Sequence, residues 1–376
     1  MARANHPIRY PLLAISLFLL VLALWAGLTR LGLDASWLQS RLVLGHGPFM
    51  VCGFLGTLIS LERSVALGRW WAYIPPVFSG AGSLWLAARL TGAAPVFLIV
   101  LGSAGLVVLF AHIVIRQPAL FTATMGLGAG AWLAGNLFWL GGVAIPRMVH
   151  WWIGFLVLTI VGERLELNRF LSPSRYVRIL FAAALALFLV GLIGSSVVPL
   201  DGNRMAGLGM VGFALWLARY DIARTTIRRE GLPRFIAVSL IAGYVWLGIG
   251  GLIWLFATLL EKAGSPVYLV YDASLHSIFL GFVFSMIFAH APIVFPAVTG
   301  RPLTFRRSFY AHVLLLQLSL AARVAGDLAG SLPVYRWAGA ANVAAVLLFF
   351  CNTLHGVLAG RRAEKASLAH MAQAPK

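Results

Sequence analysis

Residues 94–115 read APVFLIVLGSAGLVVLFAHIVI, a run in which His112 carries the one titratable side chain. A helix of this length rises about 33 Å, at roughly 1.5 Å per residue. That length matches a bilayer hydrocarbon core of about 30 Å. Backbone groups in lipid must find their hydrogen-bond partners within the same segment, so this run predicts a transmembrane helix.

Similar apolar runs recur along all 376 residues, of which 61% are hydrophobic and 11% charged. We predict an all-α polytopic membrane protein with about twelve transmembrane helices, forming one transmembrane domain over 1–376 without a sizeable soluble part. The predicted spans are 9–28, 43–61, 71–88, 94–115, 119–140, 149–167, 177–198, 204–221, 235–260, 273–296, 309–328 and 335–358. The connections between them are short and are punctuated by proline and glycine.

The net charge of +18 is distributed unevenly between the two sides of the predicted membrane. With the N-terminus in the cytoplasm, 21 of the 29 lysines and arginines lie on the cytoplasmic side. The positive-inside rule then predicts cytoplasmic N- and C-termini, which requires an even number of spans. We therefore expect a multi-pass protein of the bacterial inner membrane whose basic face contacts anionic lipid headgroups rather than nucleic acid.

Three predicted spans share a pattern in which a Gly-Phe pair is followed, nine residues after the glycine, by a second pair. These are Gly53-Phe54 with Glu62-Arg63, Gly154-Phe155 with Glu163-Arg164, and Gly281-Phe282 with His290-Ala291. The pattern predicts three four-helix repeats, at about 1–117, 118–231 and 232–376. The alternative explanation is that glycine is common in membrane helices because it permits close packing.

Histidine occurs near the outer end of each of these three helices, at His46, His150 and His276. Imidazole suits haem iron, copper and zinc, and facing helices of a bundle can build such a site. The alternative is that each histidine bonds a carbonyl or water at the interface. We expect this trio to be the candidate metal or cofactor site.

Other intramembrane polar groups lie deeper or toward the cytoplasmic side. His290 and His312 are further candidate metal ligands or members of a polar track, because ionisable residues inside spans often mark function. Arg323 and Asp327 are spaced to pair on one helix face, as a structural pair or as a partner for an anionic group. The Glu62-Arg63 and Glu163-Arg164 pairs are expected to snorkel and anchor their helices.

The twelve spans and the segment His46-Gly47-Pro48-Phe49-Met50 resemble subunit I of the haem–copper oxidases. That resemblance implies that His46 and His276 are axial haem ligands and that His150 is a copper ligand. The chain departs from the oxidase pattern: Gly154 replaces a tyrosine, span seven has no histidine, and Ile278 replaces a histidine. The chain also resembles the NnrS family, although it lacks that family's His-Ala-His-Glu opening.

The NnrS resemblance implies haem, with copper as a possible second metal, and a role in nitric oxide or redox-stress handling or in electron transfer. The competing hypothesis is a permease for a metal or small solute, in which the histidines form a translocation or proton path. The sequence contains no Walker A loop, dinucleotide fingerprint, CxxCH or HExxH motif, so it does not define an enzyme class.

Overall fold

The computed structural model describes residues 7–33, 40–89, 92–171, 174–301 and 303–373, and no strand occurs within these ranges. The α-helices are α1 (Arg9–Arg30), α2 (His46–Pro48), α3 (Thr57–Leu67), α4 (Ile74–Arg89), α5 (Ala93–Arg116), α6 (Leu120–Leu140), α7 (Ile145–Asn168), α8 (Arg175–Val197), α9 (Pro199–Tyr220), α10 (Ala223–Thr226), α11 (Leu232–Lys262), α12 (Val267–His276), α13 (Ser285–Thr299), α14 (Phe309–Leu328) and α15 (Leu332–Gln373). Two π-helical segments, η2 (Phe49–Gly56) and η5 (Ser277–Phe284), and three 3₁₀ segments, η1 (Ser40–Gly45), η3 (Trp70–Tyr73) and η4 (Arg169–Leu171), complete the regular structure.

Nine helical stretches within the described residues are long and apolar enough to cross a membrane. Each of them falls on a predicted span, so the prediction of an all-α protein with many membrane-length apolar helices is confirmed. The remaining predicted spans, 71–88, 119–140 and 204–221, fall on α4, α6 and α9, which do not meet the same criteria of length and hydropathy.

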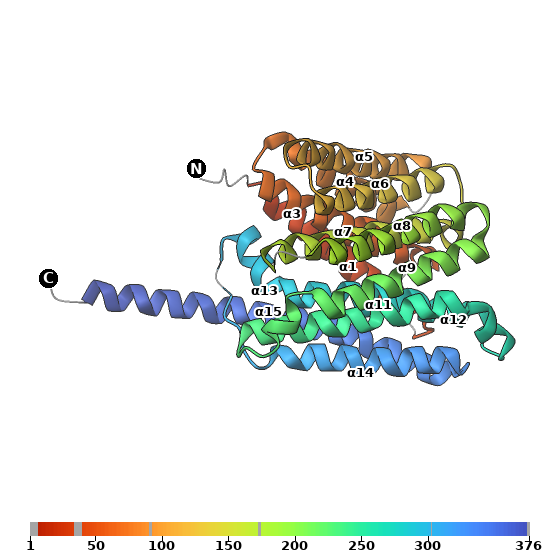
Figure 1. The fold of residues 1–376 in the computed structure, drawn as a ribbon. Coiled ribbons are helices and arrows are strands. Elements are labelled where there is room, and N and C mark those ends of the chain that lie inside the picture. Colours follow the sequence, from red (N-terminus) through yellow and green to blue (C-terminus); the bar gives the residue numbers. More distant parts are fainter. Residues whose placement is uncertain (1–6, 34–39, 90–91, 172–173, 302, 374–376) are drawn as a thin grey trace.

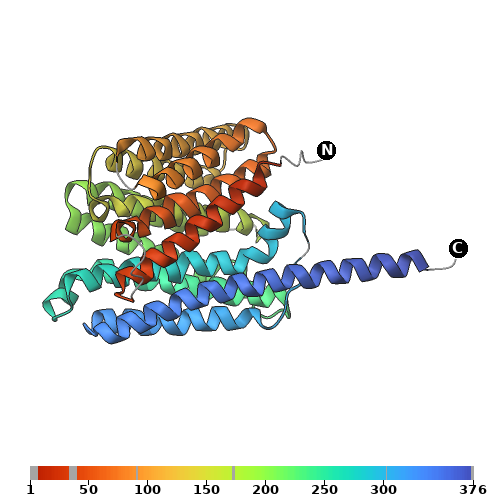
Figure 2. The same cartoon turned by 180° about the vertical axis from the view of Figure 1, so that it is seen from behind.

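The long helices run side by side in one bundle, and helices adjacent in sequence pack as antiparallel pairs, such as α8 with α9 and α14 with α15 (Figure 1). From behind, α1 runs obliquely across the bundle (Figure 2). The start of α1 and the end of α15 lie at the same end of the bundle, and α15 extends beyond the other helices. The chain ends themselves, 1–6 and 374–376, lie outside the described residues.

The three helices predicted to be repeat-equivalent are also the most buried of the nine. The buried share is 78% for Ile145–Asn168, 67% for Val43–Leu67 and 61% for Val267–Ala297, against at most 56% for the other six. Central placement is what elements around a shared axis require. Helices that carry functional side chains would also be placed at the centre. Burial therefore does not distinguish the two explanations, and the repeat stays a prediction.

Two of these central helices contain a π-helical segment directly after a histidine. His46 lies three residues before Phe49–Gly56, and His276 immediately precedes Ser277–Phe284. The helix that carries His150 is α-helical over its whole length. π-Helical turns are rare and often occur at functional sites, so they set His46 and His276 apart from His150.

Close backbone contact holds α8 against α9, and glycine makes that contact possible. A Cβ atom at Gly191 would lie 2.1 Å from the backbone nitrogen of Ala206 on α9, whereas a Cβ atom at Gly130 would have no heavy atom within 4 Å. Small residues at helix interfaces let membrane helices approach in this way.

We expect Gly191→Ala to destabilise the protein, because the backbones of α8 and α9 must separate to admit the methyl group. Overpacking of this kind costs about 1–3 kcal/mol. Thermal unfolding of the detergent-solubilised protein measures the effect, and Gly130→Ala is the matched control with an unchanged or higher midpoint. Equal midpoints for the two variants would show that the α8–α9 contact is not tight.

Candidate functional site

His46 and His276 face each other between the two π-containing helices. Their ring centroids are 6.4 Å apart and their planes differ by 25°. That separation is too large for direct ring contact, yet it leaves space for one atom between two ring nitrogens. The pair therefore has the spacing of two ligands that share a central ion.

Each of the two imidazoles is held through its Nδ1 atom. His46 Nδ1 lies 2.7 Å from the carbonyl oxygen of Ala23 on α1. His276 Nδ1 lies 2.9 Å from the carbonyl oxygen of Asp272 and 3.0 Å from its carboxylate Oδ2. Because all of these partners are acceptors, each Nδ1 carries a proton, and in the neutral imidazole each Nε2 keeps a free lone pair. Histidine ligands of metals are typically held in this way.

Gly27 on α1 leaves the space that the His46 ring occupies. A Cβ atom at Gly27 would lie 3.1 Å from Cε1 and 3.2 Å from Nδ1 of His46. Gly27 is one helical turn after Ala23, whose carbonyl accepts the imidazole hydrogen bond. The imidazole thus lies on a turn of α1 that lacks a side chain at this point, which fixes the direction of the ring.

Both histidines line a cavity of about 630 Å³, which lies within the usual range for small-molecule and cofactor sites. Its walls are largely apolar and aromatic. The polar and aromatic residues that line it include Arg30, Trp152, Tyr271, Phe279, Arg323 and Tyr335. The cavity can therefore accept a large, flat, mostly apolar molecule with a few anionic groups.

Arg323 supports this site through a different partner from the predicted one. Its Nε and a terminal nitrogen donate to Asp272 Oδ2 at 3.1 and 2.9 Å. The expected Arg323–Asp327 pair is wrong: neither oxygen of buried Asp327 has a hydrogen-bond partner. Asp272 is on the helix that carries His276, and it therefore links His276 to a buried guanidinium on α14.

The distance between the two imidazoles fits a single metal ion. An ion with an imidazole nitrogen at about 2.0 Å on each side would separate the ring centres by roughly 6 Å. No group of three or more His, Cys, Asp or Glu side chains that could hold a metal exists in the described part of the chain. His46 and His276 are thus the two side chains that this spacing offers to an ion.

The third member of the predicted trio does not join the other two. His150 Nε2 lies 3.1 Å from the hydroxyl oxygen of Ser196 on α8, and its ring lies beside Trp151. The neighbouring residues Val149 and Trp152 line the cavity, whereas His150 does not. The expected convergence of all three histidines is therefore wrong, because His150 is on the opposite face of its helix.

The remaining predicted ligands, His290 and His312, lie apart from the cavity. His312 is fully buried, with Nδ1 3.1 Å from the side-chain nitrogen of Asn352, and phenylalanine rings pack edge-on around it. His290 Nδ1 lies 2.8 Å from the carbonyl oxygen of Met286. Neither histidine belongs to a metal-binding cluster within the described ranges.

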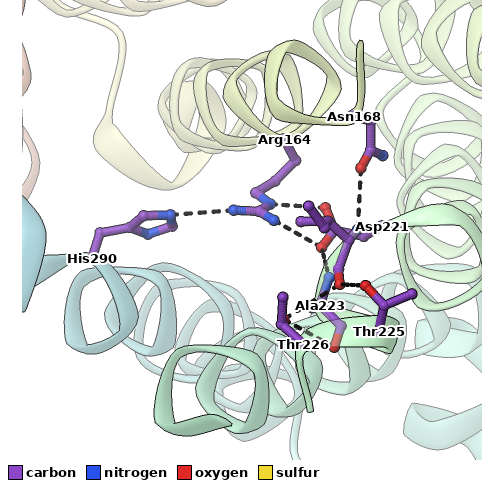
Figure 3. A network of polar contacts seen from close by, with 8 residues as sticks. Arg164, Asn168, Asp221, Ala223, Thr225, Thr226 and His290 are labelled. Carbon is purple, nitrogen blue, oxygen red and sulfur yellow. Dashed lines mark hydrogen bonds and ion pairs between the residues drawn. The ribbon is translucent and has the colours of Figure 1, made fainter. Parts of the chain in front are cut away.

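His290 instead belongs to a buried ionic network with Arg164 and Asp221 (Figure 3). Arg164 donates through Nε and a terminal nitrogen to the two carboxylate oxygens of Asp221, at 2.9 and 2.7 Å, and another terminal nitrogen lies 3.3 Å from His290 Nε2. The backbone nitrogen of Ala223 also donates to Asp221. Snorkelling is therefore wrong for Arg164, whose side chain is 2% exposed. Arg63 pairs with Glu163 and is likewise largely buried.

Sequence reasoning missed Asp272 and Asp221, the two carboxylates that organise these sites. Asp272 stands four residues before His276, a spacing that places both on one helix face, and this signal was available. Asp221 follows the last residue of α9 and reaches back to α7, a contact between distant segments that spacing does not reveal.

The apolar helices and the two buried polar centres define this protein as an all-α polytopic membrane protein with a cavity between two histidine-bearing helices. The chain belongs to the family described as a domain of unknown function, DUF8744, whose model matches residues 9–358. A comparison with curated proteins finds no match.

We expect Asp221→Asn to destabilise the protein strongly, because it leaves the Arg164 guanidinium buried without a counter-charge. Removing one partner of a buried pair typically costs about 3–5 kcal/mol. Thermal unfolding in detergent measures the loss. The double variant Arg164→Met with Asp221→Asn should regain most of it, because no unpaired charge remains.

The matched control is Asp201→Asn, which breaks the exposed Asp201–Arg204 pair. Its midpoint should stay close to that of the parent protein, since exposed pairs contribute little. A midpoint for Asp221→Asn as high as that of Asp201→Asn would contradict a structural role for the buried pair.

Proposed function

We propose that this protein is a haem-binding integral membrane protein in which His46 and His276 are the two axial ligands. In this proposal the chain crosses the bacterial inner membrane twelve times, with both ends in the cytoplasm. Its activity is electron transfer, within the wider class of redox and nitric oxide handling that the sequence resemblance suggests. The observation that carries the proposal is the facing pair of imidazoles, 6.4 Å apart, on the wall of a 630 Å³ cavity.

The residues around the cavity have the properties that a haem site requires. Ala23 and Asp272 accept hydrogen bonds from the Nδ1 atoms and thereby keep both Nε2 lone pairs directed to a ligand. Arg30 supplies a positive charge on the cavity lining, where it can attract a carboxylate such as a haem propionate. A bound haem supplies one-electron chemistry, and the protein tunes it through these ligands and their hydrogen bonds.

Two protein ligands favour electron transfer over direct gas binding. Haem held by both His46 and His276 would supply one-electron chemistry, and nitric oxide could bind the metal only after one histidine was displaced. His150, which the resemblance makes a copper ligand, lies beside Ser196 instead, so the proposal is limited to haem.

We expect the purified protein, in detergent and from haem-sufficient cells, to show a Soret band and sharp reduced α and β bands. His46→Ala and His276→Ala should each lose most of the bound haem, because each removes one axial ligand. His112→Ala is the matched control, since His112 contacts Trp71 and does not line the cavity. It should retain the parent spectrum and haem content.

Full haem content in both His46→Ala and His276→Ala would refute the axial pair. A colourless, metal-free parent protein that is correctly folded would refute haem binding altogether. The latter result would favour the competing hypothesis of a permease, and uptake assays would then be the next measurement.

The hydrogen bond from His276 to Asp272 gives a second expectation. Asp272→Asn should weaken haem binding by about 10–100-fold, the usual effect of removing the partner of a ligating histidine. It should also raise the reduction potential, because a neutral acceptor makes the imidazole a weaker electron donor. Haem titration and redox titration measure the two effects, and Asp201→Asn is the control. An unchanged potential would rule out a tuning role for Asp272.

A further inference from the structure

A second cavity, of about 680 Å³, lies where α9 ends and the chain turns into α10. We call it the arginine cavity, because three arginines line it. Its lining includes Ser174, Trp216, Arg219, Tyr220, Arg224 and Arg228. It is distinct from the histidine cavity, with which it shares no lining residue.

The arginine cavity has a strong excess of positive charge. Arg219, Arg224 and Arg228 are exposed, and within the described ranges none of them has a carboxylate within 4.0 Å. The one carboxylate in the lining is Asp221, which is fully buried and whose two oxygens are taken by Arg164 and by the backbone nitrogen of Ala223. Three guanidinium groups therefore surround a space without a counter-ion from the protein.

Local contacts hold the lining in position. Trp216 Nε1 donates to the carbonyl oxygen of Val177 on α8 at 2.8 Å, which ties α9 to α8 at the cavity wall. The Arg219 guanidinium lies 5.2 Å from the centre of the Tyr220 ring, and Arg224 donates to the carbonyl oxygen of Arg219 at 3.4 Å. The site thus combines a fixed aromatic wall with arginines whose guanidinium groups can donate paired hydrogen bonds.

The helices that lead away from the arginine cavity present apolar side chains to their surroundings. Ile193 on α8 is 60% exposed and Leu215 on α9 is 67% exposed. Further exposed apolar residues on the same two helices are Ile179, Val190, Val197, Met205 and Leu208. An exposed apolar surface on a membrane helix is a surface for acyl chains. A ligand that joins a phosphate to acyl chains therefore fits both surfaces.

We propose that the arginine cavity binds the phosphate headgroup of an anionic phospholipid, whose acyl chains lie along α8 and α9. Arginine binds phosphate through paired hydrogen bonds, and basic pockets between membrane helices are known to hold anionic headgroups. The cavity is on the side of the bundle that the arginine bias assigns to the cytoplasm, where anionic lipids act on membrane proteins. This inference does not depend on haem binding.

The test is native mass spectrometry of the full-length protein in detergent, titrated separately with phosphatidylglycerol and with phosphatidylcholine. The parent protein should bind phosphatidylglycerol with a clear preference and a low stoichiometry. The triple variant Arg219→Gln, Arg224→Gln, Arg228→Gln should lose that preference. The expected loss in affinity is roughly 100-fold, at about fivefold for each charge removed.

The matched control removes the same charge from elsewhere on the same side: Arg69→Gln, Arg116→Gln and Arg301→Gln. These arginines are exposed and do not line the cavity. The control should keep the phosphatidylglycerol preference. An equal loss in both triple variants would overturn the proposal, because binding would then follow total charge rather than the cavity.

A third arm separates a lipid from a free anion. Inorganic phosphate is titrated into the parent protein, and thermal stabilisation is measured. A cavity-dependent response to inorganic phosphate without any preference between the two lipids would overturn the lipid assignment. The unfolding midpoints of both triple variants, compared with that of the parent protein, show whether a loss of binding reflects a loss of folding. The single variant Arg228→Gln, if its midpoint equals that of the parent, must still weaken phosphatidylglycerol binding.

Discussion

A polar group that this chain buries is costly unless it finds a partner inside the protein, because lipid hydrocarbon offers none. The backbone meets that demand by forming helices throughout the described residues. The buried side chains meet it by bridging helices: Arg164 reaches Asp221, and Arg323 reaches Asp272. Asn136 and Asn342 do the same, since they bond Trp152 and Ser319 across helix interfaces. The same bridges fix the relative positions of the helices that form the two cavities.

At the histidine cavity, the hydrogen bonds that satisfy the imidazoles also leave the site ready to bind a ligand. One nitrogen of each imidazole is occupied by an acceptor on the protein, and the other lies free beside a cavity. Asp272 has two roles there, because it accepts from His276 and neutralises Arg323. The energetic cost of burying Arg323 is thus offset by the same carboxylate that orients a candidate ligand. A single side chain couples the stability of the helix pair to the chemistry of the cavity.

The helical architecture could be predicted from the sequence, because apolar length is a local property. Helical depth singled out three histidines, and the pairing of His46 with His276 was implied by the resemblance to the oxidases. Three features could not be obtained in that way. The direction of His150 depends on which face of α7 meets α8. The partner of Arg323 depends on the packing of α12 against α14. The burial of Arg164 depends on Asp221, which lies in a loop distant in sequence. The three-unit repeat stays a prediction, although its three helices are the most buried.

The π-helical segments change the helical phase between the two ends of the helices that carry His46 and His276. In a continuous α-helix each residue turns by about 100°, so the face that His46 presents would dictate the face presented by Glu62 further along. The segment Phe49–Gly56 breaks that relation, as Ser277–Phe284 does between His276 and His290. The helix that carries His276 thereby lines the histidine cavity at one end and contacts Arg164 through His290 at the other. An insertion or deletion of one residue within Ser277–Phe284 would rotate His290 relative to His276 by about 100°, and one of the two histidines would then leave its site.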